Sequence, residues 1–335
     1  MKKQLNCLQK ILIFGVKNEI IYSFCNGVAG LGLSLKYFEE RDINEASVQY
    51  FIKGITPLLY KQMIVLMKSG KYSFLHGAIE IAHCCYKNEH ESLLLDDFLD
   101  ELSYVSIKTC NGVAWYSTSR EKDIILNVIN LSLSHGLAGI FFFMRKICTL
   151  DTVLPLLRDS VRFIINQQQD QTIYNVCSPT IVSEILNYRK SRFVWCNGDL
   201  GTAYSFMSAS NILNNNEYRD IDLKVLLHCT QRNDIKKDFV QDAGVCHGSA
   251  GIAHIFNRVY QTTGDDDFKE AALYWLDDCI NKSCFNDGLA GYKVWRKYVW
   301  ITIKGILEGI AGIGLVLLAA ISDIEPDWDE CLLLS

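Results

Sequence analysis

Two kinds of helical segment alternate along the chain. Segments such as Ile140–Met144 and Ile313–Ala320 are apolar on nearly every face, which is typical of helices that are buried all round. Between them lie amphipathic segments such as Asp265–Ile280, which follows Gly264, a residue suited to a helix C-cap. Strand-like alternation is largely absent. The pattern therefore predicts an all-α fold in which inner helices alternate with outer ones.

A glycine motif marks the beginning of each inner segment. It consists of a polar residue, a glycine, two further residues and usually a second glycine. The motif occurs at Asn26–Gly30, His135–Gly139, Asn197–Gly201, His247–Gly251 and Glu308–Gly312, with a degenerate copy at His76–Glu80. Its first glycines are 50 to 62 residues apart, which leaves room for two helices in each repeat. Six inner–outer pairs that close into a ring give an α/α toroid, with residues 1–335 as a single domain.

The glycines themselves predict fold rather than function. Small residues at the start of an inner helix let it begin close to the backbone of a neighbouring helix. A further copy, Gly288–Gly291, falls outside the repeat register and is predicted to lie in a loop.

Metal-binding residue types occupy the junction between each loop and its inner helix. The residues before the first glycines are Asn26, His76, His135, Asn197, His247 and Glu308, and those one position earlier are Cys25, Leu75, Ser134, Cys196, Cys246 and Leu307. Since Cys196 and Cys246 are equivalent in adjacent repeats, we expect their thiols to lie together beside His247. Two thiolates and an imidazole suit zinc and leave a fourth position open. Alternatively, these are small buried residues at a tight junction, as we expect for Cys25, which lacks an adjacent histidine.

At these residues the sequence resembles the lanthionine synthetase C-like family. The matching stretches are Trp195–Gly198, Cys246–Gly248 and Ser134–Gly139, together with the glycine repeats, over roughly residues 20 to 322. The combination is specific, whereas a lone Gly-x-x-Gly would be weak. The resemblance implies an enzyme of lanthipeptide and antibiotic biosynthesis. Such an enzyme closes thioether rings by adding cysteine thiols of a dehydrated precursor peptide to dehydroalanine or dehydrobutyrine.

The resemblance also implies residue roles. Cys196, Cys246 and His247 would hold one zinc ion per chain, which removes the proton of a substrate thiol. His135 would act as the acid–base residue that protonates the α-carbon, and Arg192 would stabilise enolate charge. The alternatives are a capping role for His135 and a surface or ion-paired role for Arg192.

Three departures from the family pattern bear on activity. Ser73 stands where the family usually has an aspartate, and a serine cannot carry negative charge, so His76 is the candidate to replace it. Asn197 stands where a tyrosine is usual after the zinc cysteine. The family usually shows seven repeats and this chain shows six, so the toroid is incomplete or residues 1–22 are a remnant of the first repeat.

Composition excludes several other classes of protein. The net charge is −5 and no block of Lys and Arg occurs, which argues against a nucleic-acid partner. The longest apolar stretch, Gly309–Ile321, has 13 residues, whereas a transmembrane helix needs about 20, so it is predicted to be a buried core helix. The 13 cysteines are an odd number in a long chain and indicate a reduced, cytoplasmic protein.

Three functions remain open. The leading hypothesis is a zinc-dependent cyclase acting on a dehydrated peptide. A second enzyme would add glutathione or another small thiol to dehydrated proteins. The third hypothesis, which Ser73 favours, is a catalytically degenerate zinc scaffold that partners a lanthipeptide dehydratase.

Overall fold

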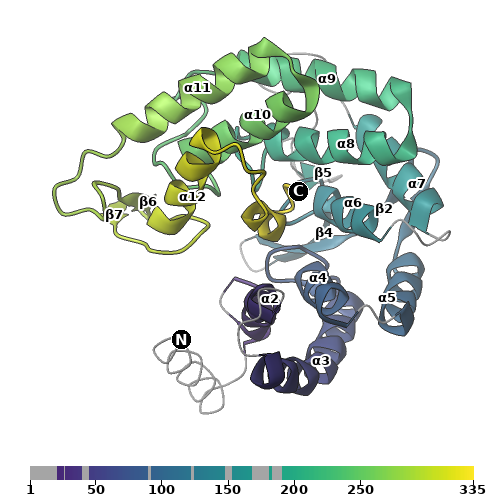
Figure 1. Cartoon of the computed structure of the whole chain (residues 1–335). Coiled ribbons are helices and arrows are strands. Elements are labelled where there is room, and N and C mark those ends of the chain that lie inside the picture. The colour runs from purple at the N-terminus through teal and green to yellow at the C-terminus, as the bar shows by residue number, and fades with distance from the viewer. Residues whose placement is uncertain are drawn as a thin grey trace. The chain divides into compact units, whose positions relative to one another are not determined.

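The computed structural model describes residues 21–25, 27–39, 45–89, 92–121, 124–147, 153–167, 181–182 and 191–335 (Figure 1). The chain divides into two compact units, residues 1–106 and residues 107–335. Of the predicted remnant repeat in residues 1–22, all but the last two residues lie outside the described residues. A single toroid domain spanning the chain, and the number of its repeats, stay predictions.

The first unit is helical. It contains α2 (Val28–Glu39), α3 (Glu45–Lys68), α4 (Ala78–Glu89) and α5 (Ser92–Tyr104). Helix α2 contacts α4, and α3 contacts all three of the others. Leu35 of α2 packs in one cluster with Val48 and Ile52 of α3. The sequence places α2 and α4 directly after the first glycines of two repeats, so these two are the inner helices of the unit.

The second unit continues the alternation. Its inner helices are α6 (Leu137–Lys146), α8 (Asp199–Leu213), α10 (Ser249–Thr263) and α12 (Ile310–Ile321). They contact one another in chain order. The outer helices α7 (Val153–Ile165), α9 (Asn216–Thr230) and α11 (Asp266–Asn281) each pack against the inner helix that precedes them. Figure 1 shows α9 and α11 lying outside α8 and α10.

Burial separates the two kinds of helix as the hydrophobic pattern predicts. Every residue of α8 from Asp199 to Ser210 is buried. Helix α11 buries one face, at Phe268, Ala271, Ala272, Trp275 and Cys279, with the spacing of three and four expected for an amphipathic helix. Its N-cap is Asp265, whose carboxylate accepts the main-chain N–H of Asp267. Gly264, with φ of 71°, is the C-cap of α10, as the sequence predicts.

Helix α12 does not meet the expectation of burial on every face. It buries Gly312, Ile313, Val316 and Ala319, which lie on one side, while Leu318 is 60% exposed. Helix α12 contacts α10. None of the helices in the described ranges combines the length and apolar character that crossing a membrane requires.

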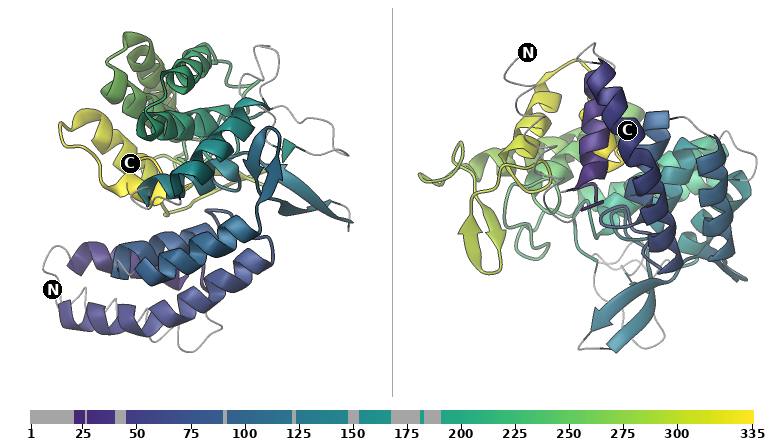
Figure 2. Two further views of the ribbon diagram at one scale, coloured as in Figure 1. Left: turned by 90° about the vertical axis from the view of Figure 1, so that its right-hand side faces the viewer. Right: turned by 90° about the horizontal axis from the view of Figure 1, so that it is seen from below.

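Short antiparallel strands supplement the helices. They are β1 (Ile107–Thr109) with β2 (Gly112–Ala114), β3 (Ser117–Glu121) with β4 (Ile124–Asn130) and β5 (Ile181–Val182), and β6 (Val294–Arg296) with β7 (Val299–Ile301). The β3–β4 and β6–β7 hairpins project away from the helices of their unit (Figure 2). The turn between β6 and β7 places Lys297 and Tyr298 at positive φ, where asparagine and glycine are usual. The sequence therefore carried no hairpin signal there.

The glycine motif begins each of six helices. Helices α2, α4, α6, α8, α10 and α12 each start one residue after a first glycine. A Cβ on the second glycine of α10, Gly251, would lie 1.8 Å from the carbonyl oxygen of Val245. The close contact is thus with the loop of the same repeat, not with a neighbouring helix as expected. The out-of-register Gly288–Gly291 lies in a loop, as predicted, where Ala290 and Gly291 have positive φ.

The C-terminal segment, which includes a 3-10 helix at Trp328–Leu332, is fastened to the inner helices of the second unit. Trp195 donates its indole N–H to the carbonyl of Leu332 at 2.9 Å. Asp329 is fully buried and lies 2.8 Å from Nε2 of His254 and 3.0 Å from Nε of Arg258.

Replacing Asp329 with alanine is expected to destabilise the protein by about 3–5 kcal/mol, because the buried Arg258 guanidinium loses its buried carboxylate. Urea denaturation followed by circular dichroism measures the loss. The control is Asp323→Ala, an exposed carboxylate that also follows α12 in the chain, which should change stability by less than about 0.5 kcal/mol. Equal effects of the two substitutions would show that the Asp329 contacts are not stabilising.

Candidate metal centre

Main-chain hydrogen bonds join the loops that precede the inner helices of the second unit. The N–H of Ser134 donates to the carbonyl of Cys196 at 3.1 Å, that of Cys196 to Cys246 at 3.3 Å, and that of Cys246 to Leu307 at 2.7 Å. These four residues all stand two positions before a first glycine. The repeat register predicted from the sequence is therefore present as a ladder of backbone contacts, and it brings Cys196 beside Cys246.

The two thiols at this ladder lie in hydrogen-bond contact. The Cys246 side chain donates to the Cys196 sulfur, and this bond lowers the pKa of Cys196, with help from the positive charge of Arg192. The pKa of Cys246 is raised well above its usual value, first because its proton is held by Cys196 and second because it is desolvated. The first proton of the pair is thus lost more easily than the second. Neither cysteine is in a disulfide.

His247 follows Cys246 directly, and its ring is turned toward a buried carboxylate. Nε2 lies 3.8 Å from Oδ2 of Asp242, whose side chain is 2% exposed. Asp242 is held in place because its oxygens accept the main-chain N–H groups of Gly244 at 2.9 Å and Trp295 at 3.1 Å. Cys196, Cys246 and His247 do not form a group whose ligand atoms all lie within 4.8 Å of one another. The structure therefore pairs the two sulfurs. His247 is adjacent to Cys246 in the sequence, but its ring faces Asp242.

Asp242 was not predicted from the sequence. Its signal is local: Oδ1 accepts the N–H two residues on, an Asx turn that opens the loop before α10. Asn130 makes the same bond to Ser132 at the equivalent place before α6, at 2.9 Å. Comparing the loops of the repeats position by position would have singled out Asp242.

The remaining predicted residues of this unit lie in the same row of loops. His135 follows Ser134, whose hydroxyl also donates to the Cys196 carbonyl at 2.9 Å, and its side chain is half-buried. Arg192 is exposed and pairs through its backbone with Gly198, and its charge acts on both cysteines. Asn197 accepts the Ser132 hydroxyl at 2.7 Å, so its amide ties one loop to the next.

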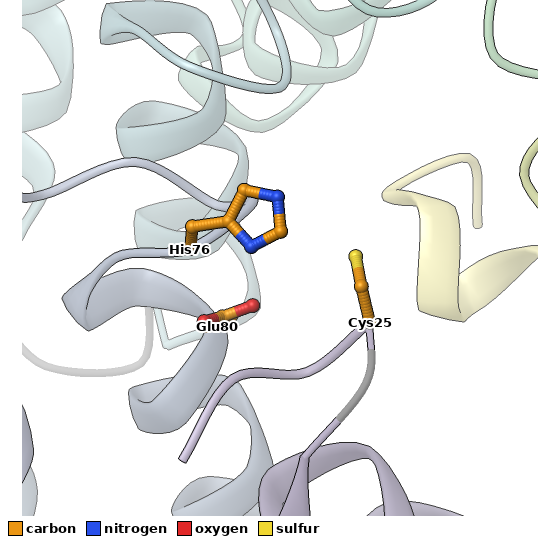
Figure 3. A group of neighbouring side chains, drawn as sticks. All are labelled: Cys25, His76 and Glu80. Carbon is orange, nitrogen blue, oxygen red and sulfur yellow. The ribbon is translucent and has the colours of Figure 1, made fainter. Parts of the chain in front are cut away.

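His76 belongs to a different cluster, in the first unit. Among the described residues, Cys25, His76 and Glu80 are the group whose potential ligand atoms all lie within 4.8 Å of one another (Figure 3). Cys25 is exposed, so the expectation of a buried thiol is wrong. Cys25 lies in the loop before α2, and the main-chain N–H of the preceding residue, Phe24, donates to the Glu80 carboxylate at 2.7 Å.

Charges in this cluster are perturbed by desolvation. Burial raises the pKa of Glu80 to about 7, although the main-chain N–H groups of Phe24 and His76 donate to it. Partial desolvation and the neighbouring Glu80 charge raise the pKa of Cys25 to about 11. Ser73, at the position of the expected aspartate, donates its hydroxyl to the Leu75 carbonyl at 2.5 Å. The Ser73 hydroxyl is therefore hydrogen-bonded within its own turn.

Comparison with known proteins decides the family. The model of the lanthionine synthetase C-like proteins matches residues 2–333. The chain belongs to the lanthionine synthetase C-like family. The resemblance noted in the sequence is thereby confirmed.

Two relatives differ in how much of this chain they match. The nisin biosynthesis protein NisC of Lactococcus lactis subsp. lactis is 22% identical over 98% of this chain and 80% of its own length. The glutathione S-transferase LANCL1 of Danio rerio is 26% identical, but over 44% of this chain and only 35% of its own length.

A solved structure gives the fold. The structure titled nisin cyclase superposes with a TM-score of 0.76, at 17% identity, over 99% of this chain and 85% of its own. This likeness and the mostly helical described residues agree with the predicted all-α toroid of the lanthionine synthetase C-like family. The hairpins described above are additions to the inner and outer helices.

Proposed function

We propose that this member of the lanthionine synthetase C-like family is a zinc-dependent lanthipeptide cyclase. It acts in a reducing, cytoplasmic compartment on a dehydrated precursor peptide, alone or beside a lanthipeptide dehydratase. The observation that carries the proposal is the contact between the Cys196 and Cys246 thiols, at equivalent positions of adjacent repeats and next to His247. The relative named nisin biosynthesis protein, which matches most of the chain, supports the substrate class.

The donor set fits zinc. Two adjacent cysteine sulfurs and one imidazole are ligands that zinc favours, and three protein ligands leave a position for substrate. The Cys246 side chain already donates to the Cys196 sulfur, and His247 follows Cys246 directly in the chain. When bound there, zinc supplies positive charge that favours the thiolate form of a substrate cysteine.

The chain's own residues account for the remaining chemistry. The substrate sulfur forms a bond to the β-carbon of dehydroalanine or dehydrobutyrine, and the C=C electron pair becomes an enolate. The positive charge of Arg192, which already acts on the cysteine pair, favours that negative charge. His135 gives a proton to the α-carbon, so the addition is complete without a leaving group. We assign no acid–base role to His76, because its ring lies in the cluster with Cys25 and Glu80.

Asp242 is expected to orient His247. Metal-binding histidines commonly direct their second ring nitrogen to a carboxylate, and loss of that partner typically costs about 10–100-fold in metal affinity. Asp242→Asn removes the charge that His247 faces, so zinc affinity should fall by about that factor. Competition with a chromophoric chelator measures it. Asp323→Asn, which alters an exposed carboxylate, is the control, and equal affinities of the two variants would contradict the role of Asp242.

A second function is favoured by one observation. Nearly half of the chain matches a protein named as a glutathione S-transferase, so addition of a small thiol to dehydrated proteins is the alternative. The third hypothesis, a degenerate scaffold, rests on Ser73, whose hydroxyl is used in its own turn.

One experiment separates the three functions. A dehydrated peptide that contains cysteine is incubated with the zinc-loaded protein, with and without glutathione, and then treated with a thiol-alkylating reagent. A cyclase leaves the peptide mass unchanged, and the peptide is then not alkylated because its cysteine thiol has been consumed in the ring. A glutathione-adding enzyme raises the mass by one glutathione. An unaltered, fully alkylated peptide under both conditions would overturn the enzymatic proposal.

A further inference from the structure

We propose that Cys25, His76 and Glu80 form a second zinc site, in the part of the chain formed by residues 1–106. The site shares no residue with the proposed centre at Cys196, Cys246 and His247, and it binds zinc through a thiolate, an imidazole and a carboxylate.

The three side chains converge from two repeats. Cys25 lies three residues before the start of α2, His76 lies two residues before α4, and Glu80 lies in the first turn of α4. Their ligand atoms all lie within 4.8 Å of one another. Figure 3 shows the sulfur of Cys25 and the ring of His76 on either side of one space, with the Glu80 carboxylate below it.

This spacing is close to what zinc requires. Bonds of about 2.0–2.3 Å in a tetrahedral site place the ligand atoms roughly 3.3–3.8 Å apart. The side chains of Cys25 and His76 are exposed, so they can turn inward to bring their ligand atoms from separations of up to 4.8 Å to those of a zinc site. One sulfur, one nitrogen and one oxygen ligand form a set that suits zinc better than magnesium or calcium, which prefer oxygen alone.

Glu80 is held as a ligand would be held. Its side chain is 1% exposed, and it accepts the main-chain N–H of Phe24 at 2.7 Å and that of His76. A carboxylate offers about four lone-pair sites, so two accepted bonds leave capacity for a metal. Such outer bonds fix the orientation of a ligating carboxylate. Because these bonds come from Phe24, the residue next to Cys25, and from His76 itself, all three ligands are linked.

His76 differs from the other junction residues. Among those that the structure describes, which are His76, His135, Asn197, His247 and Glu308, it alone has positive φ, at 72°. A histidine rarely adopts this conformation, which here turns the N–H of His76 to Glu80 while its ring remains beside Cys25. The backbone departs from the repeat at the residue that completes the cluster.

Zinc bound here would join the loop before α2 to the start of α4, two inner helices that already contact each other. It would therefore stabilise the folded state by mass action, more strongly as the zinc concentration exceeds the dissociation constant. The open fourth position would be available to water or a thiol.

Zinc stoichiometry tests the proposal independently of activity. Protein stripped of metal, reloaded with zinc and freed of excess should hold about two equivalents per chain. Cys25→Ala should hold about one, and so should a Cys196→Ala/Cys246→Ala double variant. Cys284→Ala, which removes another exposed cysteine, should still hold two. The second site would be overturned if Cys25→Ala still held two equivalents of zinc. It would also be overturned if the wild type held only one equivalent and Cys25→Ala retained it.

The design separates this inference from the proposed function. If the wild type holds one equivalent of zinc and the Cys196→Ala/Cys246→Ala variant holds none, the second site is contradicted and the proposed function is not. If that single equivalent is lost in Cys25→Ala and kept in the double variant, the second site is supported and the zinc centre of the proposed function is contradicted.

Cobalt identifies the ligands in the second site. In the Cys196→Ala/Cys246→Ala background, Co²⁺ should show thiolate-to-metal charge-transfer absorption, and this band should disappear when Cys25→Ser is added. Glu80→Gln, which retains an acceptor for a main-chain N–H, should weaken Co²⁺ binding at least about 10-fold. Absence of the thiolate band, or unchanged affinity in Glu80→Gln, would contradict the assignment of these ligands.

Discussion

Alanine in place of Cys246 is expected to remove one equivalent of zinc from the protein and to abolish ring closure. Cys246 lies in contact with Cys196, and the loss of one of three protein ligands leaves a single thiol and His247, which is insufficient for a stable zinc site. The Cys246 backbone also accepts a hydrogen bond from Cys196 and donates one to Leu307. Alanine retains both bonds, so the fold should survive. Elemental analysis and circular dichroism give the two readouts.

The matched control is Cys229→Ala. Cys229 is a free, fully buried thiol of the outer helix α9, so its replacement tests the effect of losing a buried sulfur without touching the proposed ligands. This variant should keep all of its zinc and lose only stability, through the small cavity that the substitution creates. If the Cys246→Ala protein kept the same zinc content as Cys229→Ala, Cys246 would have to be removed from the metal centre.

The repeat register was the most informative part of the sequence. Because the first glycine of the motif precedes each inner helix, it fixes which loop residues are equivalent. The ladder from Ser134 through Cys196 and Cys246 to Leu307 follows from that equivalence. The C-cap of α10 and the N-cap of α11 were also local features, because Gly264 and Asp265 act within one turn of the chain. In both cases the determining contacts are local or repeat at a fixed period.

Other features depend on contacts that no local pattern carries. Asp242 is fixed in part by the N–H of Trp295, which lies 53 residues further on in a hairpin. That hairpin turns at Lys297 and Tyr298, residue types that rarely mark such a turn. The cluster of Cys25 with His76 and Glu80 joins two repeats and includes a histidine with positive φ. No pattern in the sequence predicts this conformation.

Replacement of His135 with alanine is expected to lower the rate of ring closure by about 10²–10⁴ and to leave the zinc content unchanged. His135 stands at the same repeat position as His247, but the residue before it is Ser134 rather than a cysteine. The hydroxyl and N–H of Ser134 both donate to the Cys196 carbonyl, so this loop is fastened beside the cysteine pair by residues other than His135. The substitution should therefore remove a proton donor without moving the metal ligands.

The pH dependence distinguishes a proton donor from a residue that only supports the loop. If His135 gives the proton to the α-carbon, the wild-type rate should fall as pH rises and the imidazole loses its proton, and this descending limb should disappear in His135→Ala. His135→Asn, which can hydrogen-bond but cannot transfer the proton, should be as slow as alanine. Recovery of the rate in His135→Asn would assign the residue a capping role, and loss of zinc from His135→Ala would make it a ligand.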